Sequence, residues 1–488
     1  MDHCPNPQIR TPCANPMALT NLNEDVLQSV FLLLSVKRLL ALMSTCRILF
    51  RTGLPALLGR PHRIKEQNLQ SFHDFLERFA PTSFTSLLDL DFDGVQDTAQ
   101  LGIIAAILVR TTSLQDLRID LDTDFSSCRD IEQENALIQA LAALSTLRYL
   151  RLRGEGGFFT LPCLTQSHAP LVHLQIRMGI IDKVLPLLVN FADTLESVEL
   201  YYLSLSKVAF RCPRVTHLSL WSCEETLLPI LFAIFPNVEV LSINSGCIEG
   251  PWLDGDFRSI KKIRDESISL QESQRWDSLV SLAVDPMAIY ILGIQRELPS
   301  VVMPLGLDFS SSYECASLRM AFESLRPQHL QLGICVDPTY LGAALGMGMD
   351  RLDRLDLRIE LRSDSPPDFA DRMLNALGSL KIYMLHCIFY NDAYLEDDRA
   401  QVDEMIEGLN ARELASKAMN AAPRLKFARF DVGSGRRSSY WFIPEDAEGN
   451  RQLREITQCD PDILCCINCL YLPFQVQDDN YYPVYWDD

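Results

Sequence analysis

A six-residue template of apolar residues, L-x-x-L-x-L, recurs about a dozen times and constrains the fold of this chain more than any other feature. Between Leu147 and Val238 successive copies begin 20 to 24 residues apart. The alternating part of each copy suits a short strand whose second and third apolar residues point into a shared core. One unit of this size cannot bury its apolar face alone, so we expect the units to stack as one array. The copies begin at Leu87, Leu114, Leu147, Leu171, Leu195, Val215, Val238, Leu279, Val302, Pro327, Leu352 and, with weaker agreement, Leu425.

Segments with helical periodicity separate many of these copies. One strand and one returning helix per unit predict an α/β solenoid of parallel strands. The pattern resembles leucine-rich-repeat proteins of the irregular kind over about residues 85 to 432. This resemblance implies parallel strands on the concave face and helices on the convex face. The helical segments are Glu134–Leu144, Asp182–Phe191, Thr226–Phe235 and Asp368–Leu377.

The repeats also set the expected domain organisation. We interpret residues 1–21 as a flexible lead, residues 22–80 as a helical module with linker helices, and residues 81–458 as the solenoid with a terminal cap. Within the solenoid, residues 391–419 form an acidic, amphipathic insertion that we expect as one or two exposed helices. Residues 459–488 form an acidic, aromatic tail, which is either a recognition peptide or an aromatic strip packed on the cap.

The charge of the chain limits its partners. With 44 Lys and Arg against 64 Asp and Glu, the formal net charge of −20 argues against nucleic acid and anionic membranes, since clustered cations bind both. Residues 1–80 carry 9 basic and 6 acidic residues, whereas residues 391–488 carry 10 and 19. The start of the chain shows no apolar export signal, and the longest apolar runs are far shorter than the ~20 residues of a membrane span. We therefore expect a cytoplasmic or nuclear protein, or one found in both places, with reduced cysteines.

The sequence contains no familiar catalytic or metal-binding motif. Phosphate-binding glycine loops, dinucleotide fingerprints, nucleophile elbows and paired zinc histidines are all absent, so we expect no catalytic residues and no cofactor. One cysteine cluster has the right residue types for a metal, but only its last two members have the close spacing of a zinc-ligand pair. We interpret it as a buried apolar patch and expect no metal. The cluster is Cys459, Cys465, Cys466 and Cys469.

The template residues that alternate with the core positions point away from the core and form a sheet face. Arginine and aromatic side chains on a rigid sheet are typical of interface hot spots, so we predict a target-binding surface on this face. The alternative is an ordinary polar sheet face. The predicted residues are Tyr149, Arg151, Arg153, His173, Arg177, Tyr201, His217 and Trp221. His173, His217 and His329 share the position before the central apolar residue, but without a neighbouring acid and nucleophile they only weakly indicate a catalytic triad.

The segment Leu22–Phe50 precedes the repeats and has a different period. Its apolar residues follow three-and-four spacing, which predicts two short helices with one apolar stripe left unburied. The order of residues resembles an F-box, with Asn23 where that family usually has proline. The matching residues are Leu22, Asp25, Val26, Leu27, Val30, Phe31, Leu34, Leu39, Leu40, Leu42, Cys46 and Arg47.

The F-box resemblance, followed by leucine-rich repeats, implies the substrate receptor of a Skp–cullin–F-box ubiquitin ligase. In such a complex the F-box docks on a Skp-type adaptor, and through it on a cullin-RING ligase, while the repeats hold a target protein. The chain itself would then be non-catalytic. One alternative is a leucine-rich-repeat scaffold whose first helices only cap the repeats, and an enzyme is the third candidate. The expected adaptor contacts are Leu22, Val26, Leu27, Val30, Phe31 and Leu34.

Overall fold

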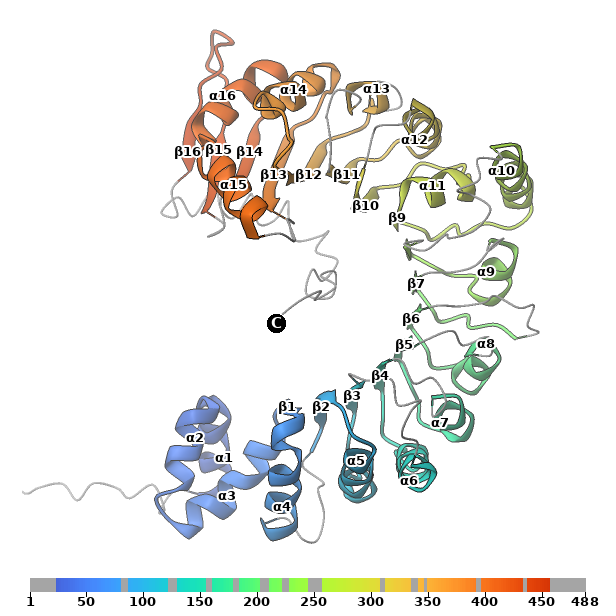
Figure 1. Cartoon of the computed structure of the whole chain (residues 1–488), viewed down its shortest axis with the longest axis vertical. Coiled ribbons are helices and arrows are strands. Elements are labelled where there is room, and N and C mark those ends of the chain that lie inside the picture. Colours follow the sequence, from blue (N-terminus) through green and yellow to red (C-terminus); the bar gives the residue numbers. More distant parts are fainter. Residues whose placement is uncertain are drawn as a thin grey trace, which may run out of the picture. The chain divides into compact units, whose positions relative to one another are not determined.

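The computed structural model describes residues 23–79, 87–121, 130–154, 160–178, 184–201, 210–221, 228–244, 257–307, 312–334, 341–345, 349–391, 396–432 and 437–456. The chain divides into two compact units, Met1–Leu195 and Glu196–Asp488, which we call unit 1 and unit 2. Both are α/β, with helices and strands alternating along the chain (Figure 1). No helix among the described residues is long and apolar enough to cross a membrane.

Unit 1 begins with three helices and continues as strand–helix repeats. Its strands pair in parallel, each with the next in sequence. The central template residues Leu90, Leu117, Leu150 and Leu174 are in register and buried, so they form one row of the core. The elements are α1 (Glu24–Leu33), α2 (Val36–Met43), α3 (Arg47–Leu58), β1 (His62–Lys65), the 3-10 helix η2 (Glu66–Asn68), α4 (Leu69–Phe79), β2 (Asp89–Val95), α5 (Thr98–Arg110), β3 (Asp116–Leu121), α6 (Ile131–Ala142), β4 (Tyr149–Gly154), α7 (Thr160–Gln166), β5 (His173–Met178), α8 (Val184–Leu187) and η4 (Leu188–Phe191).

Unit 2 continues the same alternation. Strands β6 to β14 pair in parallel in sequence order, and most of the helices lie on one side of them (Figure 1). The elements are β6 (Ser197–Tyr201), β7 (His217–Trp221), α9 (Leu228–Ile234), β8 (Val240–Asn244), α10 (Phe257–Gln271), β9 (Ser281–Val284), α11 (Pro286–Leu292), β10 (Ser300–Leu307), α12 (Ser312–Leu325), β11 (His329–Ile334), α13 (Leu341–Leu345), β12 (Arg354–Leu361), α14 (Phe369–Ala376), η6 (Leu377–Ser379), β13 (Met384–Asn391), α15 (Glu396–Glu407), α16 (Ala411–Ala421), β14 (Phe427–Val432), β15 (Arg437–Phe442) and β16 (Arg454–Ile456).

The end of unit 2 changes direction. Strands β14, β15 and β16 pair antiparallel, with an isolated bridge between Glu445 and Arg451 in the turn before β16. Trp441 and Ile456 are buried here, so this hairpin covers the last parallel strand with its own apolar side chains. The expected lead, residues 1–21, and the expected tail, residues 459–488, lie outside the described residues.

Two expectations about the repeats are wrong in detail. The copy expected to begin at Val302 is out of register, because Val301 and Met303 are the buried core positions of β10 and Val302 is only half-buried. The true copy begins four residues earlier, at Leu298, because Leu298 is buried and Val301 and Met303 pair in register with the core positions Leu330 and Leu332. Strand β13 adds a further repeat, in which Leu385 and Cys387 take the core positions.

The acidic segment 391–419 is less exposed than expected. It begins at the last residue of β13 and supplies α15 and most of α16, and each of these helices buries one face. Val402 and Ile406 are buried on α15, and Leu414 is buried on α16. Lys417 of α16 also pairs with Asp371 of α14 at 2.6 Å. Helix α16 therefore belongs to the packed helical layer of unit 2, whereas α15 packs beside β13.

Candidate functional site

The first three helices of unit 1, residues 23–60, form a small module with its own core, which we call the helical head. Leu27 and Phe31 of α1 pack with Leu39 and Met43 of α2 and with Leu49 of α3, and all five are buried. Further apolar residues of α3 and Phe75 of α4 complete this cluster. A tight fit is visible at one glycine of α3: a Cβ at Gly53 would lie 2.7 Å from Cγ of Met43.

Polar residues fix both ends of α1. Asn23 is the N-cap, and its side chain accepts a hydrogen bond from the Asp25 N–H at 3.2 Å. Its φ of −58° is close to the angle that a proline ring imposes, so Asn23 keeps the backbone geometry and adds a cap. At the other end, Arg60 Nη2 donates to the carbonyl oxygens of Phe31 at 2.7 Å and Leu34 at 2.6 Å. The Phe31 carbonyl also accepts from the Leu34 N–H at 3.2 Å, so Arg60 adds a second bond there and binds the Leu34 carbonyl at the C-cap.

The expected adaptor contacts divide between the core and the surface of the head. Leu27 and Phe31 are buried, so the expectation that they lie on an exposed stripe is wrong. The reason is the third helix, α3, whose apolar face covers the stripe that two helices would leave open. Val26 is exposed, Val30 and Leu34 are partly exposed, and Leu22 lies outside the described residues.

A different apolar surface remains on the head. Of the fourteen large hydrophobic side chains that are exposed in the described parts of the chain, six lie between residues 26 and 48. Leu33 is 88% exposed and Leu32 is 67% exposed, both at the end of α1. An apolar concentration of this kind on a folded module is typical of a protein interaction site. The six residues are Val26, Leu32, Leu33, Val36, Leu40 and Ile48.

The predicted target-binding residues of unit 1 lie on β4 and β5, on the face that the template assigns to them. Tyr149, Arg151, Arg153 and Arg177 are half-buried, and His173 is exposed. The ring of Tyr149 lies 6.0 Å from the ring of His173 between centroids. The Tyr149 hydroxyl donates to Gln175 Oε1 at 3.3 Å. The five side chains thus form one surface on two neighbouring strands.

Acidic residues of β2 and β3 balance the arginines on this face. Arg153 pairs with Asp120 at 3.3 Å, and Arg118 pairs with Asp116 at 3.1 Å while stacking on the Tyr149 ring at 5.2 Å. Burial, and then the negative charge of Asp89, raise the pKa of Asp116 to about 6. The predicted arginine and aromatic residues of unit 1 therefore lie on a mixed-charge face.

The remaining predicted residues belong to unit 2. Tyr201 and Trp221 occupy paired positions on β6 and β7, and their rings stack with centroids 5.1 Å apart and planes 2° apart. The Tyr201 hydroxyl donates to Glu199 at 2.8 Å, and the Trp221 indole N–H donates to Ser219 at 3.1 Å. These bonds hold both rings in place.

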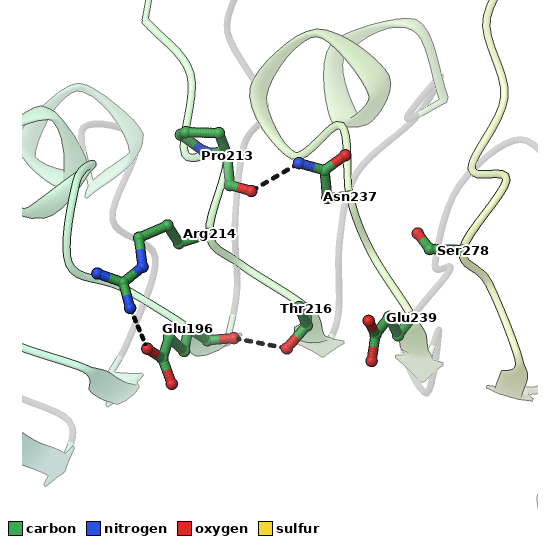
Figure 2. Close-up of a pocket in the computed structure, with 7 residues that line it drawn as sticks. All are labelled: Glu196, Pro213, Arg214, Thr216, Asn237, Glu239 and Ser278. Carbon is green, nitrogen blue, oxygen red and sulfur yellow. Dashed lines mark hydrogen bonds and ion pairs between the residues drawn. The ribbon is translucent and has the colours of Figure 1, made fainter.

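A polar groove of about 490 Å³ lies beside β6, β7 and β8, at the ends where these strands begin (Figure 2). Arg214 Nη2 donates to Glu196 Oε1 at 2.6 Å, and Asn237 Nδ2 donates to the Pro213 carbonyl at 2.7 Å. His217 is exposed next to this groove and hydrogen-bonds Thr216 Oγ1 at 2.9 Å. The contact described for His217 is thus with a hydroxyl and not with an acid. The groove residues are Glu196, Pro213, Arg214, Thr216, Asn237, Glu239 and Ser278.

Two histidine–aspartate pairs lie buried on strands β11 to β14 of unit 2. His329 Nε2 donates to Asp356 Oδ2 at 2.9 Å, and His386 Nε2 donates to Asp431 Oδ2 at 3.0 Å. His386 Nδ1 also lies 4.0 Å from Asp356 Oδ1, which joins the two pairs. Each aspartate binds an arginine two residues earlier on its own strand. We call this network the histidine–aspartate ladder: His329, Arg354, Asp356, His386, Arg429 and Asp431.

The ladder lowers the pKa of its carboxyl groups despite their burial. Desolvation alone would raise the pKa of Asp431, but the hydrogen bonds from His386 and Arg429 lower it to about 2. The pKa of Asp356 is lowered for the same reason by His329 and Arg354. Both aspartates are therefore ionised and fully hydrogen-bonded at neutral pH.

Ser300, His329 and Asp356 have the residue types of a catalytic triad. Ser300 Oγ lies 3.4 Å from His329 Nδ1, on the ring edge opposite Asp356. However, Ser300 is 3% exposed and His329 is 6% exposed, whereas a nucleophile must reach a substrate. Asp356 also accepts a hydrogen bond from Arg354. We therefore interpret the three side chains as part of the packing of the strands.

Among the described residues, no group of three or more His, Cys, Asp or Glu is placed to hold a metal ion. The cluster from Cys459 to Cys469 lies outside the described residues.

Sequence reasoning missed the ladder, although one signal was present. The pattern Arg-x-Asp occurs at 354–356 and again at 429–431, each time on alternating positions of a strand.

No family model matches this sequence, and a search of curated proteins found no match.

Proposed function

We propose that this protein is the substrate-recognition subunit of a Skp–cullin–F-box ubiquitin ligase. The helical head would dock on a Skp-type adaptor, and the strand faces of the repeats would hold a target protein. The observation that carries this proposal is the apolar surface of the head. Its core is closed by its own three helices with Phe75, yet six large apolar side chains remain exposed within 23 residues, from Val26 to Ile48.

The position of these side chains revises the expected contacts. Leu32 and Leu33 at the end of α1 take the place of Leu27 and Phe31, while Val26 remains a candidate. Arg60 holds the backbone that carries Leu32 and Leu33 through its bonds to Phe31 and Leu34. Exposed apolar side chains on a fixed backbone suit a groove in a partner, because less backbone freedom is lost on binding.

Co-purification with a recombinant Skp-type adaptor tests the docking step. Burying a leucine side chain is worth ~1.5–3 kcal/mol, so Leu33→Asp should weaken adaptor binding by at least about tenfold. Val109→Asp is the matched control, because Val109 is 65% exposed on α5, outside the head. We expect the wild type and the Val109 variant to retain the adaptor and the Leu33 variant to lose it. If the wild type retains no adaptor, the scaffold alternative replaces the ligase proposal.

The proposed target surface comprises Tyr149, Arg151, Arg153, His173 and Arg177 in unit 1, and Tyr201, His217 and Trp221 in unit 2. What supports it is the ordered set of arginine and aromatic side chains on both strand faces. Each unit supplies its own part, held by hydrogen bonds within that unit. Catalysis in such a complex comes from bringing the target close to a ubiquitin-charged enzyme, which needs no active site in this chain.

A further inference from the structure

The helical head carries a group of exposed cations that lie close together in the sequence. Lys37, Arg38, Arg47 and Arg51 are all exposed, and none of them forms an ion pair or a side-chain hydrogen bond within the described residues. Beyond the head, four arginines of unit 1 form ion pairs with acids, three of them with acids of a neighbouring element and Arg118 with an acid of its own strand. The pairs are Arg63 with Asp93, Arg110 with Glu77, Arg118 with Asp116 and Arg153 with Asp120.

The whole chain has an excess of acid, which makes unpaired cations notable. Its net charge is −20, so acidic side chains to neutralise a cation are plentiful in the sequence. The described head nevertheless carries five cations and only two acids, Glu24 and Asp25. Of the five cations, Arg60 donates hydrogen bonds to backbone oxygens. The head is therefore a locally basic module on an acidic protein.

The location of these cations also opposes helix stability. Lys37 and Arg38 lie in the first turn of α2, and Arg47 is the first residue of α3. The N-terminal end of a helix carries partial positive charge, so acids are favoured there and cations are unfavourable. Neither helix has an acid in its first turn, and neither N-cap side chain forms a capping bond. Residues that act against local stability are expected at functional sites.

The cations accompany the exposed apolar side chains on the same helices. Lys37 and Arg38 directly follow Val36, and Arg47 and Arg51 stand one helical turn apart beside Ile48. We infer that the partner surface for the head is an apolar groove rimmed by Asp and Glu carboxylates, and that these carboxylates pair with Lys37, Arg38, Arg47 and Arg51. This inference rests on the proposed function, because it names the chemistry of the adaptor surface.

Charge pairs at the rim of an interface act mainly on the rate of association. They attract the partner before contact, and salt screens this attraction over about 8 Å at physiological ionic strength. The apolar side chains, by contrast, set the rate of dissociation. The head should therefore show fast, salt-sensitive association and slow, salt-insensitive release.

Association kinetics of the full chain with a recombinant Skp-type adaptor at 50 and 500 mM NaCl test the inference. We expect the wild-type association rate to fall about tenfold between these two salt concentrations, with little change in dissociation. The double variant Lys37→Glu/Arg38→Glu should associate about tenfold more slowly at 50 mM NaCl and lose most of the salt dependence. Glutamate suits the first turn of α2, so loss of folding would not explain this result.

The control is a pair of exposed arginines in unit 2, Arg412 in the first turn of α16 and Arg424. Arg412→Glu/Arg424→Glu makes the same change in net charge and should leave both rates unchanged. Adaptor binding that is insensitive to salt and to the Lys37/Arg38 variant would overturn the inference and leave the proposed function standing. No adaptor binding by the wild type would instead refute the proposed function. Binding of the wild type to phosphatidylserine vesicles in place of the adaptor would overturn the inference by showing a lipid partner.

Discussion

Replacing Asp356 by asparagine would test the stability of the histidine–aspartate ladder. The carboxylate accepts hydrogen bonds from His329 Nε2 at 2.9 Å, from Arg354 Nη2 at 2.6 Å and from Arg354 Nε at 2.9 Å. The change keeps the size of the side chain and removes its charge. The guanidinium of Arg354, with its side chain 13% exposed, then loses its counter-ion, and an amide nitrogen faces cationic donors.

The expected magnitude follows from the cost of a buried charge without a partner. Removing one member of a buried ion pair costs ~3–5 kcal/mol. We expect a value near the lower end, about 3 kcal/mol, because Arg354 lies close enough to solvent to turn outward. Every 1.4 kcal/mol changes an equilibrium constant about tenfold, so local opening of β12 and β13 should become roughly 100-fold more frequent.

The thiol of Cys387 offers a local measurement of this opening. Cys387 lies on β13, pairs in register with Leu357 of β12, and is completely buried. Burial, and then the charges of Asp356 and Asp431, raise its pKa well above the usual value, so the folded state should not react with iodoacetamide. Mass spectrometry of the Cys387 peptide should show about 100-fold faster labelling in Asp356→Asn.

Cys163, buried on α7 of unit 1, is the internal control and should label at the wild-type rate. Equal labelling of Cys387 in the two proteins would mean that the ladder adds little to local stability. Equal acceleration at Cys163 would mean that the substitution acts on the whole chain. Either result would refute the reasoning from the local charge network.

Three further substitutions have directional outcomes. Phe31→Ala empties the core of the head and should cost ~3–5 kcal/mol, seen as rapid trypsin cleavage within the head. Arg60→Met removes two charge-assisted bonds to α1 and should weaken adaptor binding by up to about tenfold in a titration, with the repeats still folded. The pKa of Asp116 is raised to about 6 in the folded protein, whereas in the unfolded chain it is near 4. The ionised carboxyl therefore destabilises unit 1 above about pH 6. This destabilisation disappears as the pH falls from about 6 toward 4. Asp116→Asn should therefore raise the thermal stability at pH 7.5, and this gain should shrink toward pH 4.

The sequence contained enough information to predict the repeat architecture. Template positions such as Leu117 and Leu150 are buried and in register because a strand places alternate residues on one face. The copy at Val302 was placed wrongly because two sets of apolar residues, one beginning at Leu298 and one at Val302, both fit the template. The repeat at β13 was missed because Cys387 takes a position usually held by leucine.

The candidate sites were harder to predict, because they depend on contacts between distant residues. His386 and Asp431 are 45 residues apart in the sequence, and their bond exists only because β13 and β14 are adjacent and in register. The periodicity of the sequence places His386 and Asp431 on the same face of the sheet. It does not indicate that their side chains are in contact. The exposure of Leu33 likewise depends on α3, whose apolar face covers Phe31 and leaves the end of α1 uncovered.

Two features of unit 1 support our proposal that the head docks on a partner, in preference to capping the repeats. A cap must cover the open end of the first repeat, and β1 and α4 already do so in unit 1. Strand β1 pairs with β2, and Glu77 of α4 pairs with Arg110 of α5. The helical head lies before these elements in the chain and packs on α4 through Phe75, yet Leu32 and Leu33 remain exposed, which a capping role does not explain. Exposing these two leucine side chains to water is unfavourable in free energy, and a partner protein that buries them would remove this cost. We therefore favour docking over capping.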